Sequence, residues 1–95
     1  MWKAKHKVVL PVGVLHFAGE LVRWGDWGQA RVMAFSYRDP RSGELVTIEQ
    51  AVRVSRPSEW RPRRGPAEIL CWGVLRSGLL RHPLFVGWRR PARRR

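Results

Sequence analysis

The chain has 95 residues, which is enough for one small domain but leaves no room for a second, catalytic one. The chain has 19 lysine and arginine residues and only 7 aspartate and glutamate residues, so its formal net charge is +12. The single cysteine, Cys71, excludes an internal disulfide and a cysteine-based zinc site, and no apolar run approaches the roughly 20 residues of a membrane helix.

Five strands and no long helix are predicted along the chain. The clearest pattern lies at residues 44–54, where Val46, Ile48, Val52 and Val54 alternate with polar side chains, as in a half-buried strand. Cys71 falls in another apolar run and is expected to be a buried, small hydrophobic residue. The strands are expected at residues 8–17, 29–37, 44–54, 67–75 and 84–88.

Turn-forming residues separate these strands. Residues 39–43 (DPRSG) predict a short hairpin loop, and residues 76–78 (RSG) predict a turn between the fourth and fifth strands. The longer link at 55–66 contains three prolines, which exclude a regular helix of any length. The pattern predicts an all-β, five-stranded Greek-key barrel over residues 1–90, the architecture of the OB-fold, followed by a basic tail at 91–95, but the pattern alone does not select the OB-fold. An SH3-like barrel would give nearly the same pattern and stays open as the alternative.

The segment between the first two strands, residues 23–28 (RWGDWG), combines Arg23, Trp24 and Trp27 with two glycines. Glycine lets a backbone approach closely, and tryptophan offers a flat face on which a base can stack. These residues therefore suit a surface that grips a nucleic-acid backbone. A structural role is the alternative, in which the two tryptophans close the open end of a small barrel.

Basic side chains gather in two further places. Arg31 and Arg53 lie on the second and third predicted strands, where an OB-fold has its binding face, although a solvated face paired with glutamates would look the same. The densest internal cluster contains Arg56, Arg61, Arg63 and Arg64 in the proline-rich link. A loop of this composition contributes little to a hydrophobic core but can contact the phosphates of a nucleic acid. We therefore expect phosphate contacts from this cluster.

Charge alone favours nucleic acid as the partner. An isoelectric point near 11.8 is typical of a nucleic-acid-binding domain. An anionic membrane surface would attract the same charge, and an arginine-rich composition without a functional partner would produce it too. Tryptophans within the predicted strands, Trp72 and Trp88, are expected to be packing residues.

The run at residues 80–89 (LRHPLFVGWR) is the most motif-like part of the chain. It resembles the closing strand of the C-terminal OB-fold domain of ATP-dependent DNA ligases, where an L-R-H-P-x-F-x-x-x-R run leads into a basic R-x-D-K motif. The resemblance implies an OB-fold with a DNA-facing surface that includes Arg81, Arg89 and Arg90. Arg89 aligns with the arginine of that motif, but Pro91 and Ala92 replace its aspartate and lysine, so an adenylation role is not expected.

The sequence has no K-x-D-G adenylation motif and no set of acid, base and nucleophile, so it is not expected to be an enzyme by itself or to use a cofactor or metal. We expect a cytoplasmic module, without membrane attachment, that binds DNA in preference to RNA and is accessory to ligation, repair or replication. A separate ligase catalytic subunit is a further expected partner. The alternative is a small interaction module that binds structured RNA or an acidic protein. The candidate nucleic-acid-binding residues are Arg23, Trp24, Trp27, Arg31, Arg53, Arg56, Arg61, Arg63, Arg64, Arg81, Arg89 and Arg90.

Overall fold

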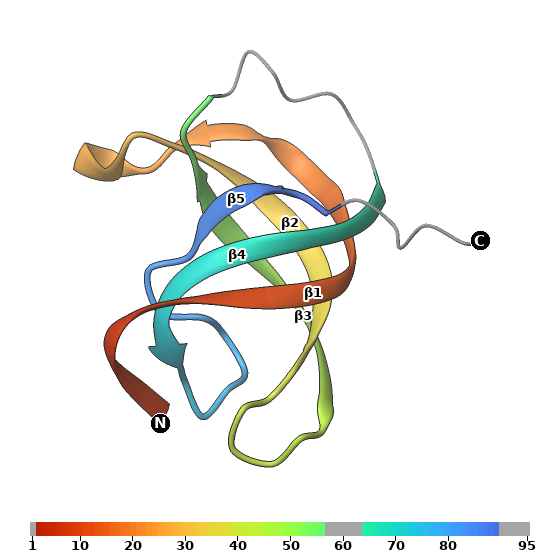
Figure 1. Cartoon of the computed structure of the whole chain (residues 1–95). Coiled ribbons are helices and arrows are strands. Elements are labelled where there is room, and N and C mark those ends of the chain that lie inside the picture. The colour runs from red at the N-terminus through yellow and green to blue at the C-terminus, as the bar shows by residue number, and fades with distance from the viewer. Residues whose placement is uncertain (1, 57–63, 90–95) are drawn as a thin grey trace.

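The computed structural model of the chain describes residues 2–56 and 64–89, without the side chains of residues 2–5 and 27. It is all-β apart from one short 3-10 turn (Figure 1). The elements are β1 (Trp2–Arg23), η1 (Gly25–Trp27), β2 (Gln29–Arg38), β3 (Leu45–Val54), β4 (Arg64–Val74) and β5 (Leu84–Trp88).

The strands form a closed barrel in the order β1-β2-β3-β5-β4. β1 pairs antiparallel with both β2 and β4, and the ring is completed by a parallel contact between β3 and β5, at Arg53 and Leu84. This is the connectivity of a five-stranded Greek-key OB-fold. The predicted fold is therefore confirmed, and the parallel closure distinguishes the ring from the SH3-like barrel that the sequence left open.

The first strand is much longer than the sequence indicated. We expected residues 8–17, whereas β1 runs over Trp2–Arg23. It gains this length because it has two neighbours: Trp2 and Lys3 pair with β4 at one end, and Leu21 to Arg23 pair with β2 at the other. Register shifts interrupt both ladders, and irregularities of this kind bend a strand so that it can serve two sheet edges.

The other strands lie close to their predicted bounds. β5 occupies the predicted residues 84–88, and β2 extends one residue beyond its predicted end. β3 begins one residue later than predicted, and β4 begins three residues earlier, at Arg64. Alternation of buried and more exposed side chains, which the sequence showed most clearly in β3, is what the barrel requires of its strands.

The barrel interior is filled by apolar side chains from every strand. Cys71 is fully buried, as predicted. Trp88 packs on Phe17 and Phe85, with ring centroids 5.6 and 5.4 Å away, which confirms its predicted packing role. The core residues are Leu10, Val12, Leu15, Met33, Phe35, Tyr37, Val52, Val54, Ala67, Ile69, Cys71, Val74, Leu80 and Phe85.

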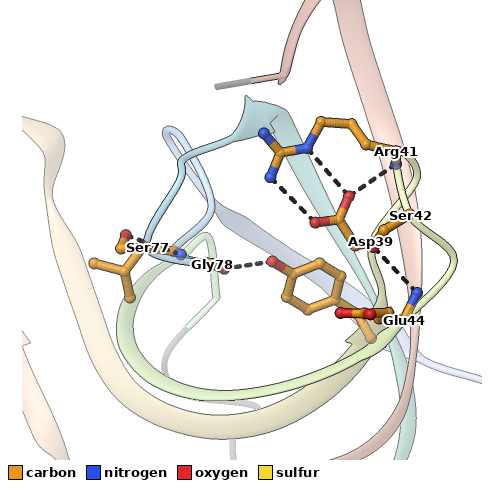
Figure 2. Close-up of polar contacts among 8 residues, drawn as sticks. Asp39, Arg41, Ser42, Glu44, Ser77 and Gly78 are labelled. Atoms are coloured by element: carbon orange, nitrogen blue, oxygen red, sulfur yellow. Dashed lines mark hydrogen bonds and ion pairs between the residues drawn. The ribbon is translucent and has the colours of Figure 1, made fainter.

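The hairpin between β2 and β3 turns at residues 39–43, as expected. Asp39 Oδ1 accepts a hydrogen bond of 2.8 Å from the Arg41 backbone N–H, and the two side chains form an ion pair of 3.1 Å (Figure 2). The Gly43 N–H donates to the Asp39 carbonyl at 2.7 Å. These contacts close the hairpin at one end of the barrel, while η1 lies at the other end (Figure 1).

The connection between β4 and β5, residues 75–83, is called loop L45 below. Its tip is anchored by the buried Tyr37 hydroxyl, which donates a hydrogen bond to the Gly78 carbonyl (Figure 2). Gly78 has φ +91°, and a Cβ there would lie 3.0 Å from Val46 Cγ1. A left-handed backbone and a close neighbour therefore both favour glycine at this tip.

Candidate functional site

A shallow hollow forms where three elements meet: the segment 24–28 between β1 and β2, called loop L12 below, the end of β3, and the end of L45. Trp24, Arg53, His82 and Pro83 line it, and its volume is about 110 Å³. Trp24 is 39% exposed, so its ring is open to a ligand. OB-folds bind oligonucleotides and oligosaccharides with this same combination of strands and loops.

The end of L45 is held against β3 by hydrogen bonds to the backbone of the loop. The Gln50 side chain makes two hydrogen bonds to Leu80, donating from Nε2 to its carbonyl at 2.7 Å and accepting at Oε1 from its N–H at 2.9 Å. Three residues further along β3, the Arg53 N–H donates to the Pro83 carbonyl at 3.0 Å. The end of L45 therefore forms a fixed wall of the hollow, although it is a loop.

His82 has an uncommon backbone conformation. Its φ is +49°, and it is the single non-glycine residue with a positive φ in the described part of the chain. Such conformations are uncommon for residues with a Cβ, and they concentrate at binding and catalytic sites. The turn exposes His82 at the rim, where it lines both this hollow and a second one.

The second hollow continues from the first across β5 to β4 and β1. It has a volume of about 180 Å³ and shares Arg53 and His82 with the first. Trp72 is 37% exposed there, and the Lys7 Nζ lies 5.6 Å from the centre of its ring. The described lining residues include no acidic side chain; they are Lys7, Arg53, Leu70, Cys71, Trp72, His82 and Leu84.

Trp72 and Lys7 were missed as candidate site residues. Trp72 was expected to pack inside the barrel, but it points outward because Ile69 and Cys71, on alternating positions of β4, are buried. The period of two along β4 places Leu70 and Trp72 on its outer face, so the signal was present in the sequence but was not used. Lys7 could not be placed, because it lies in a part of β1 that no pattern predicted.

The size of the two hollows limits what they can do. Pockets that enclose a small-molecule ligand usually have volumes of about 300–1,000 Å³. Hollows of about 110 and 180 Å³ therefore suit recognition at the surface. They offer flat rings for stacking and cations for anionic groups, and both are interactions used by nucleic-acid-binding proteins.

The structure brings some of the predicted site residues together. Trp24 and Arg53 line the first hollow, and the exposed Arg23 directly precedes Trp24. Arg81 lies in L45 beside His82 and is half-buried, and the exposed Arg56 follows the end of β3. These residues belong to the two loops and the strand that form the hollows.

Other predicted site residues lie elsewhere. Arg64 is eight residues along β4 from Trp72, roughly 26 Å at about 3.3 Å per residue. Arg89 is exposed beyond the end of β5, near Arg64, because its N–H donates to the Pro66 carbonyl at 2.9 Å. These two cations therefore form a separate basic region, away from the hollows.

Arg31 has a local packing role. Its guanidinium carbon lies 4.8 Å from the centre of the Phe17 ring, and Nη1 approaches the Gly19 carbonyl at 3.5 Å. Its Nε is buried and has no hydrogen-bond partner among the described residues. The side chain is thus held against the irregular part of β1, and this role was not foreseen because that part of the strand was not predicted.

The ligase-like run at residues 80–89 forms the end of L45, β5 and the residue after it. No protein-family model, curated protein or solved structure matches the chain. The resemblance to the ligase domain therefore depends on this run. Arg61, Arg63, Arg90 and the tail at 91–95 lie outside the described residues, as does the side chain of Trp27.

Neither a metal centre nor a membrane helix is found in the described ranges, 2–56 and 64–89. No three histidine, cysteine, aspartate or glutamate side chains gather there as ligands of a metal ion would. Nor does any helix in those ranges have the length and apolar character needed to cross a membrane.

Proposed function

We propose that the chain is an OB-fold module that binds nucleic acid, with DNA favoured over RNA, mainly through backbone phosphates. The observation that carries this proposal is the meeting of Trp24, Arg53 and His82 where L12, β3 and L45 converge. A stacking ring beside a cation, at the place where OB-folds hold oligonucleotides, is the arrangement that single-strand and backbone binders use.

The charge of the whole chain supports the same proposal. A net charge of +12 on 95 residues creates a positive field that attracts a polyanion from a distance. Contacts with phosphates carry no sequence information directly, so binding would show weak sequence preference and strong salt dependence.

The more specific form of the proposal is an accessory role in DNA ligation. It is supported by the resemblance of residues 80–89 to the closing strand of the ligase OB-fold domain, and these residues include β5. The chain itself lacks the K-x-D-G motif, so it would act with a separate catalytic subunit or as an accessory factor in repair or replication.

The test is a fluorescence-anisotropy titration of the full chain with nicked duplex, intact duplex, single-stranded DNA and structured RNA at several salt concentrations. We expect steep salt dependence, and a lower slope by about one unit for Arg53→Gln if its side chain contacts one phosphate. Arg38→Gln is the matched control, since it removes the same charge from the hairpin end of the barrel, where Arg38 bonds to the Gly43 carbonyl at 3.2 Å. Affinity that is insensitive to salt would overturn the proposal.

An interaction module remains the second candidate, because exposed apolar side chains lie beside the second hollow. Val9 on β1 is 47% exposed, and it pairs with Leu70, which lines that hollow. Exposed apolar side chains can contribute to a protein interface where they form a continuous patch. A polyglutamate probe that binds as tightly as DNA would favour an acidic protein as the partner, and a preference for the structured RNA would favour RNA.

A further inference from the structure

We propose that the two hollows act as one groove that binds unpaired nucleotides, with bases stacked on Trp24 and Trp72. This inference rests on the proposed function and makes it more specific, because it assigns single-stranded nucleic acid to one surface. The groove consists of Trp24, Pro83, Arg53, His82, Leu84, Leu70, Trp72 and Lys7, and is called the Trp24–Trp72 groove below.

The pairing of the strands makes the groove continuous. Arg53 on β3 pairs with Leu84 on β5, and Leu84 pairs with Leu70 on β4. On the far side, Val8 of β1 pairs with Cys71, which places Lys7 beside Trp72. Since Arg53 and His82 line both hollows, the two hollows lie next to each other on this surface.

The width of the groove fits several nucleotides. It crosses from β3 over β5 and β4 to β1, which is three strand spacings of about 4.8 Å, or about 14 Å. Nucleotides stacked at about 3.4 Å each would place roughly four of them along this distance. That number lies at the lower end of the site sizes of about 4–16 nucleotides known for OB-folds.

The chemistry of the groove favours unpaired bases over a duplex. In a duplex each base is covered on both faces by its neighbours, whereas an unpaired base has a face that can stack on an indole ring. Trp24 and Trp72 are 39% and 37% exposed and stand at opposite ends of the groove, with the apolar side chains of Pro83, Leu84 and Leu70 between them. A surface for phosphates alone would not need this apolar floor.

Cations are placed where they can accompany stacked bases. Lys7 lies over the Trp72 ring, and Arg53 lies in the middle of the groove. Each of these cations can approach a phosphate while a base stacks on the neighbouring ring or packs on the neighbouring apolar side chain. The described lining residues carry no carboxylate that would repel the strand.

The experiment compares three labelled probes with the full chain: an oligothymidine of about 12 nucleotides, an abasic oligomer with the same number of phosphates, and a blunt duplex of the same length. We expect the oligothymidine to bind about tenfold more tightly than the abasic oligomer, because stacking contributes only where bases are present. This comparison needs no substitution and therefore does not depend on the folding of a variant.

Variants then assign the effect to the groove. Trp24→Ala and Trp72→Ala are each expected to weaken oligothymidine binding about tenfold and to leave abasic and duplex binding within about twofold. Trp72→Phe keeps a ring and is expected to retain most of the affinity. Arg38→Gln, at the hairpin end, is the control that should affect all three probes alike.

The outcomes separate the two proposals. Equal affinity for the oligothymidine and the abasic oligomer, or equal losses for both in the tryptophan variants, would overturn the groove while leaving phosphate binding intact. If none of the three probes binds, the proposed function itself is wrong. Binding to oligothymidine that depends on bases and on both tryptophans would support the groove.

Discussion

At the scale of single residues, Tyr37 joins the barrel wall to the tip of L45. Its hydroxyl is buried and donates to the Gly78 carbonyl, and burial, followed by the nearby Asp39 carboxylate, raises the pKa of Tyr37 so that the hydroxyl keeps its proton. Tyr37→Phe leaves that carbonyl without this donor, and we expect a loss of about 1–3 kcal/mol in the free energy of unfolding, measured in urea. Thr47→Val is the control, since it removes a hydroxyl from an exposed residue, and equal losses for both would contradict this role for Tyr37.

Asp39 gives a second prediction at this scale, about pH. The side-chain hydrogen bond from Arg41, helped by the Arg41 backbone N–H, holds the pKa of Asp39 below its ordinary value. A lowered pKa in the folded state stabilises the protein above the unfolded-state pKa of about 4, and this contribution is lost as the pH falls through the folded-state value. The melting temperature should therefore drop below about pH 4, and the drop should be smaller in Asp39→Asn. Identical acid profiles for the two proteins would contradict this.

At the scale of elements, one side chain of β3, Gln50, contributes two of the hydrogen bonds that hold L45 in position. Gln50→Ala removes both hydrogen bonds to the Leu80 backbone, and we expect a loss of about 1–3 kcal/mol in stability together with faster hydrogen exchange at the Leu80 amide. The neighbouring Glu49 is exposed and provides the control, Glu49→Ala. Unchanged exchange at Leu80 in the Gln50 variant would mean that other contacts hold the loop.

The strands show what could be predicted from the sequence. Alternation located β3 within one residue, because a half-buried strand must alternate, and the predicted bounds of β5 agree with the structure. The extension of β1 could not be predicted, since residues 18–20 (AGE) have little strand preference and fall in the register shift between Phe17 and Leu21, beyond which the pairing with β2 resumes. In the candidate site, L12 and Arg53 were found from residue type, whereas the partnership of Trp72 with Lys7 depends on the register between β1 and β4, which no local pattern reveals.

At the scale of the whole molecule, charge should govern affinity. Replacing Arg61 and Arg63 together with alanine is expected to weaken DNA binding for all sequences and to lower the salt slope by about one unit for each phosphate that the variant no longer neutralises. The control replaces Arg38 and Arg76, which lie at the hairpin and the L45 turn, so both proteins have the same net charge. Equal slopes in the two double variants would show that net charge matters and the position of these arginines does not.

The closure of the barrel has a consequence for binding. β3 and β5 meet at a single register pair, Arg53 with Leu84, supported by the 3.0 Å hydrogen bond from the Arg53 N–H to the Pro83 carbonyl. Because this contact is so short, the ring can open most easily between β3 and β5. The single-stranded nucleic acid that we propose for the groove would lie across this contact. Occupation of the groove and closure of the ring would then favour each other, and a bound strand should slow hydrogen exchange at the Arg53 amide.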